Sequence, residues 1–219
     1  KTFLWKLKFF VCFAAFQPTC SHIKSLLPDS RSGSYIIDPD GSDGMLDKFA
    51  VYCNMTDKGR VGITIIHHDT EARTLVYNFR KPGSYVRNVA YNGISLQQLG
   101  ELARVSTNCE QFIKYECFHS RLRRDDMGWW VSRDGIKMTN WGGAPDLSNK
   151  CACGLHKTCA SLSYNCNCDM NDNVWRSDSG FLISKDKLPV TQLRFGDTGY
   201  TYGNAGYHSL GAFKCYGKP

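Results

Sequence analysis

The sequence has no long hydrophobic run and only a small excess of positive charge. Its longest apolar run covers residues 9–16, whereas a membrane-spanning helix needs about 20 residues. Three of the 27 basic residues, Lys1, Lys6 and Lys8, precede this run, and the remaining 24 stand against 20 acidic residues. So small an excess gives no concentrated basic surface. We therefore expect no membrane span in this chain and no nucleic-acid partner.

The sequence motifs of common enzyme classes are also missing. The chain contains no G-x-S-x-G nucleophile turn, no H-E-x-x-H zinc helix and no glycine-rich phosphate loop. His67, His68 and Asp69 are neighbours in the sequence, so they cannot converge on one substrate atom as a catalytic triad does. We interpret them as a strand end with exposed imidazoles. No catalytic residue is assigned, and the chain is predicted not to be an enzyme.

The first residues have the layout of a secretory signal. Basic residues precede the short apolar run at residues 9–16, which is typical of a signal peptide. The sequence begins with Lys1 and not with Met, so an upstream linker of a longer protein is the alternative. We assign residues 1–19 to a signal peptide or linker and residues 20–219 to one domain.

Cysteine is abundant, with 11 residues in a chain of 219. Reducing compartments keep such thiols from pairing, so we predict an extracellular location, either secreted or as an ectodomain fragment of a membrane protein. If Cys12 leaves with the first segment, ten cysteines remain, the even number that complete pairing requires. The predicted disulfide cysteines are Cys20, Cys53, Cys109, Cys117, Cys151, Cys153, Cys159, Cys166, Cys168 and Cys215.

Five of these cysteines fall between residues 151 and 168, where a metal site is the alternative to disulfides. His156 lies between Cys153 and Cys159. Zinc ligands usually come in pairs separated by two to four residues, but the pairs here are separated by one, so disulfides are favoured. An odd number in this window requires a partner outside it, and Cys215 is the natural choice. A bridge between Cys109 and Cys117 is a guess from their proximity in sequence.

The first half of the domain predicts strands and turns. Residues 34–37 are rich in strand formers and lead into residues 38–41 (DPDG), whose proline, aspartates and glycine favour a turn. Apolar residues alternate with other residues at 49–53 and at 63–66, the period of paired strands. A small antiparallel sheet is therefore expected here.

One helix is predicted from Ser95 to the neighbourhood of Thr107. Ser95 and Gln98 have the spacing of a capping box, and Ile94 and Leu99 that of a hydrophobic staple. The helix should dock on the sheet through one apolar face made of Leu96, Leu99, Leu102 and Ala103. No helix is predicted between residues 140 and 178. The chain is therefore expected to have few helices and a loop-rich second half held by disulfides.

Two further sites are marked by short motifs. Asp169, Asn171, Asp172 and Asn173 offer four side-chain oxygen ligands within five residues, as a bound calcium ion would need. The same residue types also favour turns, and no EF-hand pattern follows. A calcium site at residues 38–43 is weaker, because Pro39 and Gly41 already explain a turn there. The sequence Asn54-Met55-Thr56 is the only N-glycosylation signal, which predicts a glycan at Asn54 in a secreted protein.

Motifs along most of the chain resemble a known family. Residues 32–41 (SGSYIIDPDG) and 49–55 (FAVYCNM) resemble the opening of fibrinogen-like domains. The second half is similar to the fibrinogen-like module of the contactin-associated protein (neurexin IV) family, in residues 128–130 (GWW), 140–143 (NWGG), 151–155 (CACGL), 166–169 (CNCD), 188–191 (LPVT) and 215–217 (CYG). The resemblance implies a disulfide-bonded α+β domain of extracellular adhesion proteins, without catalytic activity. It also implies a bridge between Cys20 and Cys53.

Two functional hypotheses follow from the motifs and the resemblance. The first is a non-enzymatic extracellular recognition and cell-adhesion module, whose exposed loops bind other extracellular or cell-surface proteins. The alternative is a calcium-dependent lectin of the ficolin type that binds acetylated glycans through the segment from Asp169 to Asn173. The Gly-Gly-Trp-Thr turn common in fibrinogen-like domains is replaced here by residues 59–64 (GRVGIT), a departure that disfavours the lectin.

Overall fold

The structure is a computed structural model that describes residues 16–199 and 203–218. Most of the predicted signal segment, including Cys12, lies outside the described residues. Two residues on the N-terminal side of the proposed boundary contact the domain. The carbonyl of Gln17 accepts the N–H of Asp38 at 3.0 Å, and the hydroxyl of Thr19 accepts the N–H of His22 at 3.2 Å. The division between residues 19 and 20 stays a prediction.

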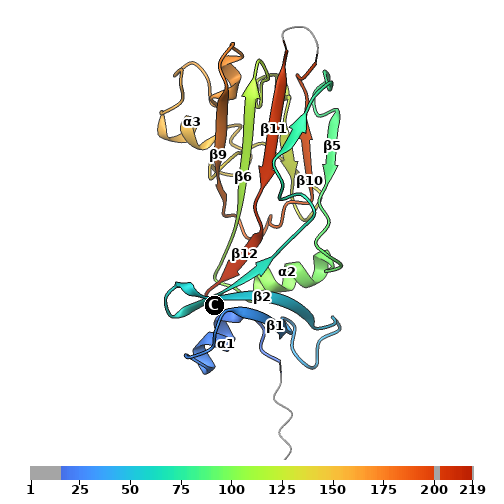
Figure 1. Ribbon diagram of the computed structural model, residues 1–219, viewed down its shortest axis with the longest axis vertical. Helices are drawn as coiled ribbons and strands as arrows, with labels where there is room; N and C mark the ends of the chain where they lie inside the picture. The colour runs from blue at the N-terminus through green and yellow to red at the C-terminus, as the bar shows by residue number, and fades with distance from the viewer. Residues whose placement is uncertain (1–15, 200–202, 219) are drawn as a thin grey trace, which may run out of the picture.

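The described chain forms two antiparallel sheets in an elongated molecule (Figure 1). The larger sheet has the order β1-β2-β3-β12-β6-β11-β4, with β9 also paired to β6. Its strands are β1 (Gly33–Ile37), β2 (Phe49–Lys58), β3 (Val61–Ile66), β4 (Thr74–Val76), β6 (Asn108–Phe118), β9 (Arg176–Leu182), β11 (Ala205–Leu210) and β12 (Phe213–Tyr216). The smaller sheet has the order β5-β10-β7-β8, formed by β5 (Tyr85–Asn88), β10 (Gln192–Phe195), β7 (Trp129–Val131) and β8 (Lys137–Met138).

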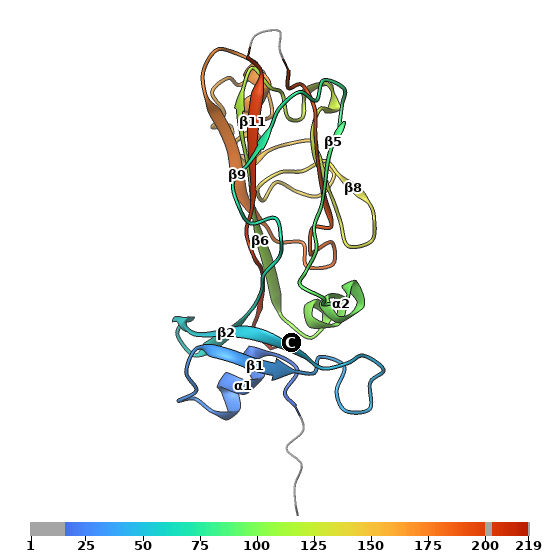
Figure 2. The same cartoon turned by 45° about the vertical axis from the view of Figure 1, so that its right-hand side comes forward.

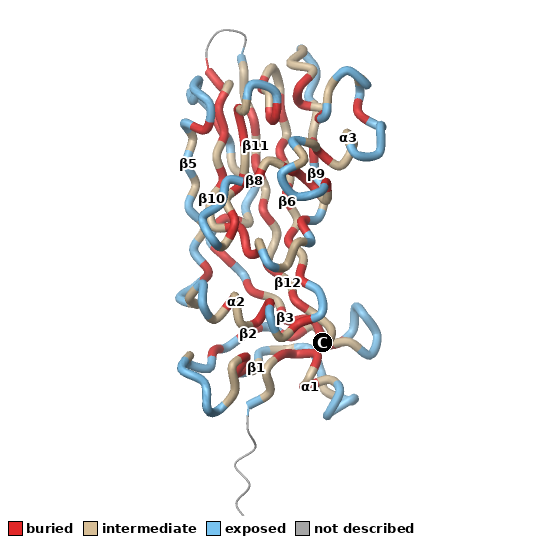
Figure 3. The backbone as a smooth tube through the Cα atoms, turned by 180° about the vertical axis from the view of Figure 1, so that it is seen from behind, coloured by how far each residue is buried: buried red, intermediate tan, exposed pale blue. Residues whose placement is uncertain are grey.

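The strand β6 organises the larger sheet. Every second residue from Cys109 to Cys117 is buried, the period expected of a strand with one face on a core. β6 pairs with β12 near its start, and with β11 and β9 further along. Its buried Tyr115 stacks on Phe195 of β10, with ring centroids 4.4 Å apart, so the core lies between the two sheets. Figure 2 shows the two layers, and Figure 3 shows buried backbone running along the inner strands.

The base of the molecule contains β1, β2, β3 and the helix α1 (Cys20–Leu26). Thr19 caps this helix, and the buried Ile23 and Cys20 face the sheet core. The expected strands near residues 34–37, 49–53 and 63–66 are confirmed as β1, β2 and β3. The alternation of buried and exposed residues in β2 from Phe49 to Thr56 reflects a sheet with one covered face.

The helix α2 (Leu96–Arg104) confirms the capping box of Ser95 and Gln98. Its buried face consists of Leu99, Leu102 and Ala103, but Leu96 is exposed, so its predicted place in the core is wrong. The helix also ends sooner than expected, with Val105 as C-cap. The reason is tertiary: the N–H of Thr107 donates to the carbonyl of Gly217 at 3.3 Å, which turns the chain into the β6–β12 pairing.

Three short helical turns complete the fold, and two of them fall where no helix was expected. α3 (Ala152–His156) and the 3-10 turn η2 (Cys168–Met170) lie between residues 140 and 178, while η1 (Arg124–Asp126) precedes β7. With five residues, α3 has too little length for a periodic signal. Two bridged cysteines, Cys151 as its N-cap and Cys153 within it, hold this turn in place.

All ten described cysteines form disulfides, and three of the five bridges link distant elements. The pairs are Cys20–Cys53, Cys109–Cys215, Cys117–Cys168, Cys151–Cys166 and Cys153–Cys159. The first is the bridge that the resemblance implies. The guessed bridge between Cys109 and Cys117 is wrong, because eight residues along one strand separate them by about 26 Å.

The expected link from Cys215 to the cysteine-rich window is also wrong. Cys215 lies directly opposite Cys109 in the β12–β6 register, and the two form a bridge there. The odd cysteine of the window, Cys168, pairs instead with Cys117 of β6. Sheet register therefore selects the partner of Cys109, while Cys168 reaches Cys117 from η2, outside the ladder.

The His67–His68–Asp69 segment is only partly as expected. His67 is exposed and contacts Glu71 at 2.9 Å. His68 is buried, and its Nε2 lies 2.9 Å from the carbonyl oxygen of Gly211. Burial lowers the pKa of His68. The expectation of two exposed imidazoles is therefore wrong for His68, which is a core residue.

Candidate recognition site

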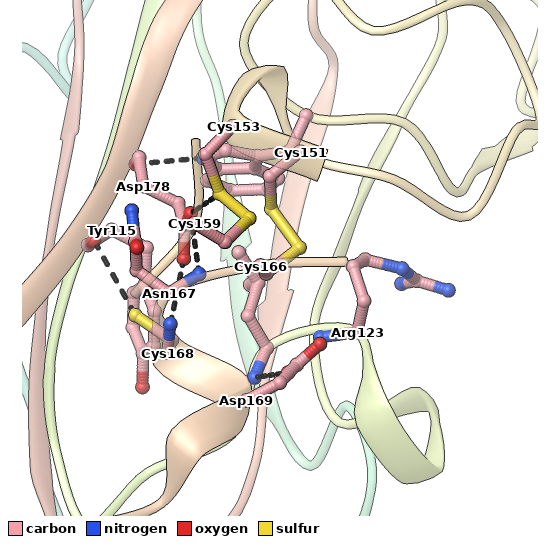
Figure 4. Close-up of a disulfide and its surroundings, with 12 residues drawn as sticks. Tyr115, Arg123, Cys151, Cys153, Cys159, Cys166, Asn167, Cys168, Asp169 and Asp178 are labelled. Atoms are coloured by element: carbon pink, nitrogen blue, oxygen red, sulfur yellow. Dashed lines mark hydrogen bonds between the residues drawn. A yellow bond between two sulfur atoms is a disulfide. The ribbon is translucent and has the colours of Figure 1, made fainter. Parts of the chain in front are cut away.

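Residues 140–175, here called the stapled segment, connect β8 to β9 with little regular structure. Two bridges, Cys151–Cys166 and Cys153–Cys159, lie within the segment. A third, Cys117–Cys168, ties it to the C-terminal end of β6. Figure 4 shows these bridges gathered beside Asp178 and Asp169. Cross-links of this kind restrict the unfolded chain and so replace part of the stabilisation that a hydrophobic core would provide.

Asp178 of β9 anchors the segment from inside. Only 3% of this residue is exposed. Its two carboxylate oxygens accept the backbone N–H groups of Asn167 and Cys168, each at 2.9 Å. Its main-chain carbonyl accepts the indole N–H of Trp141 at 3.0 Å. Burial raises the pKa of Asp178 to about 6, because the charged form is poorly solvated there.

Asp169 also anchors the stapled segment to the rest of the domain. One carboxylate oxygen accepts the backbone N–H groups of Leu122, Arg123 and Arg124 at 3.0, 2.9 and 3.0 Å. Burial raises the pKa of Asp169, while these hydrogen bonds act in the opposite direction. The carboxylate thus fixes the loop that follows β6 against the stapled segment.

The predicted calcium residues are therefore largely engaged with other parts of the protein. Asp169 binds the three N–H groups, and Asp172 forms a two-pronged ion pair with Arg176 at 2.9 and 2.6 Å. Asn173 is exposed, and Asn171 lies in the left-handed conformation at the end of η2. Calcium at this segment stays a prediction.

Two other groups have donor atoms suited to metals. In the part of the chain that the structure describes, Cys151, Cys166 and Asp178 form the only cluster of three such side chains within 4.8 Å, but its two sulfurs are already bonded to each other. Asp38 and Asp40 each keep one buried carboxylate oxygen without a hydrogen-bond partner among the described residues. Burial and the neighbouring charge of Asp40 raise the pKa of Asp38. Lys48 offsets part of the negative charge, and two neighbouring carboxylates are ligands of the kind that a divalent cation takes.

The stapled segment also exposes large apolar side chains. These are Leu147, Leu155, Leu162, Val174 and Trp175. Leu162 is 79% exposed although it lies between two bridged cysteines, Cys159 and Cys166. Scattered exposed apolar residues are ordinary, but several on one rigid segment are typical of a contact surface. Sequence reasoning missed both these leucines and Asp178, since a single apolar residue in a loop and a lone aspartate have no periodic signal.

Asn54 lies at the irregular end of β2, where the pairing with β3 shifts register. Its side-chain oxygen accepts the N–H of Thr56 at 3.0 Å and the Thr56 hydroxyl at 3.1 Å. These hydrogen bonds are exposed, so the glycosylation signal lies at the surface. The glycan itself stays a prediction.

Comparison with known proteins identifies the family. The family described as "Fibrillar collagen C-terminal domain" matches residues 15–206. The chain belongs to this family. The resemblance to the fibrinogen-like module of contactin-associated proteins is confirmed as well, together with the α+β fold class of antiparallel sheets, few helices and bridged loops.

Curated relatives of this fibrillar collagen C-terminal domain are much longer proteins. This chain is 36% identical over 195 residues to contactin-associated protein 1 of Rattus norvegicus. The alignment covers 87% of this chain and 14% of the relative. The Homo sapiens protein of the same name is 35% identical with the same coverage. Neurexin-4 of Drosophila melanogaster is 35% identical over 217 residues, covering 94% of this chain and 17% of the relative. The chain thus spans 14% to 17% of the length of these relatives.

The structure bears on the compartment of the domain in two ways. No described helix has the length and apolar content to cross a lipid bilayer. The five disulfides are typical of an oxidising, extracellular environment.

Proposed function

We propose that this domain is a non-enzymatic extracellular recognition and cell-adhesion module, which binds another protein through the stapled segment. The observation that carries the proposal is the set of exposed leucines on loops that disulfides and two buried carboxylates hold in place. Loops that are already ordered lose little conformational entropy on binding, so their apolar contacts contribute more fully to affinity. The relatives of the chain, contactin-associated protein 1 and neurexin-4, are adhesion proteins, which supports such a role.

A contactin ectodomain is the first candidate partner. The relatives are named as contactin-associated proteins, and this chain corresponds to one module of them. Binding of this module to a contactin ectodomain is the direct test. Other extracellular and cell-surface proteins form the second tier of candidates.

The test compares two exposed leucines of the stapled segment with one exposed methionine elsewhere. The variant Leu155→Ser with Leu162→Ser alters the stapled segment, and Met45→Ser alters the loop between β1 and β2, where Met45 is 99% exposed. Both variants remove only exposed side chains, so both should fold. We expect binding to an immobilised contactin ectodomain, or to a panel of cell-surface ectodomains, to weaken at least tenfold in the leucine variant alone. Equal binding by the wild-type protein and the leucine variant would refute the proposal.

The calcium-dependent lectin is the second candidate function. Its predicted ligand residues, Asp169 and Asp172, already bind backbone N–H groups and Arg176, so the observed contacts favour it less. If the domain uses calcium, the buried and unpartnered oxygens of Asp38 and Asp40 are the better ligands, and the ion would support the base.

Thermal unfolding distinguishes these two calcium positions. A cation that binds only the folded protein raises the melting temperature. We expect 1 mM calcium to raise it relative to chelator, and Asp38→Asn with Asp40→Asn to abolish that increase. Abolition by Asp172→Asn instead would assign calcium to the lectin segment, and no response to calcium would exclude both positions.

A further inference from the structure

The larger sheet has an outer face, on the side away from the smaller sheet, that is open to solvent. Figure 1 shows this face from the front, with β9, β6 and β11 side by side and no described helix over them. The odd-numbered residues of β6 from Cys109 to Cys117 are buried, so its even-numbered residues point outward. This half of the sheet therefore has one face on the core and one free face.

The outward side chains of β6 and of β9 have the same order. Each row has an aromatic side chain at both ends and two polar side chains between them. The outward residues of β6 are Phe112, Lys114, Glu116 and Phe118. The row along β9, with the residue before it, lies beside them in the order Phe181, Ser179, Ser177 and Trp175. The pattern of aromatic and polar side chains is thus the same from either end.

An aromatic pair lies at each end of the face. Phe112 and Phe181 are opposite residues of the β6–β9 ladder, and their ring centroids are 5.5 Å apart. At the other end, the ring centroids of Phe118 and Trp175 are 5.6 Å apart. Trp175 is 52% exposed and Phe181 is 46% exposed. Two exposed apolar patches, separated by about 20 Å of strand, are therefore available for contact.

The middle of the face has one charge of each sign. The Nζ of Lys114 lies 3.5 Å from a carboxylate oxygen of Glu116, and both side chains are partly exposed. Arg73 also binds Glu116, at 2.8 Å. The outward residues of β9 beside these charges are serines, whose short side chains leave the middle of the face low between the two aromatic patches.

A second copy of this chain is complementary to the face in one orientation. Consider two such sheets packed face to face, related by a two-fold axis that runs across the strands and passes over residue 115. Each outward residue of β6 then lies opposite the residue that is equally far from position 115 on the second copy. Lys114 meets Glu116 of the second copy, and Phe112 meets Phe118 of the second copy.

The same axis serves β9. Residue 178 lies opposite residue 115 in the β6–β9 ladder, so the axis falls between the two outward serines of β9. Trp175 therefore meets Phe181 of the second copy, and the serines meet each other. Aromatic side chains cover aromatic side chains at both ends of the contact, and small side chains meet in the middle.

The charges exclude the other face-to-face arrangement. A two-fold axis parallel to the strands would place Lys114 opposite Lys114 of the second copy and Glu116 opposite Glu116. Like charges held together at an interface cost binding free energy, and such repulsion gives specificity. The antiparallel arrangement alone pairs each charge with its opposite.

We propose that this face is a homophilic contact, through which two copies of the domain form a weak antiparallel dimer. The face measures about 20 Å along the strands and about 15 Å across β9, β6 and β11, which is small for a specific interface, so the dimer is reversible. Weak contacts are sufficient for adhesion proteins displayed in many copies, since multivalency raises the overall affinity. The contact uses other residues than Leu155 and Leu162, so this proposal and the proposed function can each fail alone.

Sedimentation of the full chain, with its disulfides intact, measures self-association from micromolar to millimolar concentration. We expect a reversible equilibrium between monomer and dimer. Lys114→Glu and Glu116→Lys should each weaken the dimer at least tenfold, because each brings like charges together across the axis. Circular dichroism and the melting temperature show whether each variant is folded.

An equimolar mixture of the two charge variants tests the antiparallel arrangement itself. Lys114→Glu makes both central positions acidic, and Glu116→Lys makes both basic. Opposite charges then meet only in the mixed dimer. We expect the mixture to form heterodimers at concentrations where each variant alone is monomeric.

Two apolar variants provide a second readout that leaves the charges unchanged. Trp175→Ser with Phe181→Ser removes exposed side chains of the face and should also weaken the dimer at least tenfold. Leu155→Ser with Leu162→Ser is the matched control, because it removes two exposed apolar side chains elsewhere. This control should dimerise as the wild type does.

Several outcomes would overturn the proposal. A wild-type chain that stays monomeric up to millimolar concentration would do so, as would a dimer that the charge variants and the aromatic variant leave unchanged. Folded charge variants that remain monomeric when mixed would refute the antiparallel arrangement. Loss of contactin binding in the aromatic variant, without self-association of the wild type, would assign the face to a different protein partner.

Discussion

The base and the stapled segment are ordered by different interactions. In the base, β1, β2 and β3 form a regular hydrogen-bonded ladder, and one bridge, Cys20–Cys53, joins it to α1. In the stapled segment, three bridges and the carboxylates of Asp169 and Asp178 replace the missing ladder. The comparison shows that a chain without periodic structure can be ordered when covalent links and buried acceptors satisfy its backbone.

The largest effect is expected from the bridge that closes the longest loop. Cys109–Cys215 spans 106 residues, whereas Cys153–Cys159 spans six. Loop-closure entropy predicts a loss of about 5 kcal/mol in the free energy of unfolding for Cys109→Ala with Cys215→Ala, and about 2 kcal/mol for Cys153→Ala with Cys159→Ala. Urea unfolding measures both. Equal losses would show that local strain or packing, and not loop length, determines the contribution of each bridge.

Asp169→Ala tests whether a carboxylate stands in for secondary structure. The substitution leaves three backbone N–H groups, those of Leu122, Arg123 and Arg124, without their acceptor. We expect a loss of about 3 kcal/mol in the free energy of unfolding, allowing for water to reach some of them.

The control for this prediction is Asp169→Asn. It keeps one oxygen at the position that accepts all three bonds, so it should lose much less stability. Similar losses in both variants would mean that the charge, and not the acceptor, is required.

Asp178 should make the stability of the stapled segment depend on pH. Its pKa is raised to about 6 in the folded protein, whereas an unfolded aspartate titrates near 3.9. The folded state therefore holds the proton more tightly, and this contribution is fully present below about pH 4 and is lost as the pH rises through 6. The free energy of unfolding should fall by about 2 to 3 kcal/mol across this window because of Asp178.

The comparison with Asp178→Asn isolates that contribution. The difference in free energy of unfolding between this variant and the wild type should change with pH from 4 to 7, since all other titrating groups are shared. A constant difference over this range would contradict the raised pKa.

The smallest effect is expected at α2, where a regular element has its own local signal. Ser95→Ala removes the hydroxyl that accepts the N–H of Gln98 at 3.2 Å, and loss of such a cap costs about 1 kcal/mol. Thermal unfolding should show a decrease of a few degrees. Gln98→Ala, which removes the reciprocal bond to the Ser95 N–H at 2.8 Å, should cost no more than that. A larger loss at Ser95 than at Asp169 would reverse the comparison between the two kinds of region.

Sequence patterns were most informative where structure is local. The capping box at Ser95, the turn at residues 38–41 and the strands β1 to β3 depend on neighbouring residues and on burial of one face. The exposure of Leu96 and the burial of His68 were not predictable in this way. Both depend on what packs against the residue: Leu96 at the start of α2 stays 41% exposed, and the Gly211 carbonyl lies 2.9 Å from the Nε2 of His68.

The candidate sites were harder to foresee than the fold. The segment from Asp169 to Asn173 was predicted to offer oxygens to calcium, but in the structure Asp169 binds backbone N–H groups and Asp172 binds Arg176. The ring contacts of Trp175 with Phe118 and Tyr207 join residues that no short motif connects. Only pairing of β6, β9 and β11 brings them together.

By itself the sequence determined that this is a disulfide-bonded domain with a small sheet and a capped helix, because cysteine number and local periodicity depend on residues close in the chain, and the resemblance of its motifs implied the α+β class. Tertiary structure alone decided which cysteines meet, as Cys109 with Cys215 and Cys117 with Cys168 show. For the first pair the physical reason is sheet register, because the backbone ladder places Cys109 opposite Cys215 irrespective of their separation in sequence. For the second pair, Asp178 of β9 accepts the N–H of Cys168 and so holds this loop residue beside β6, within reach of Cys117.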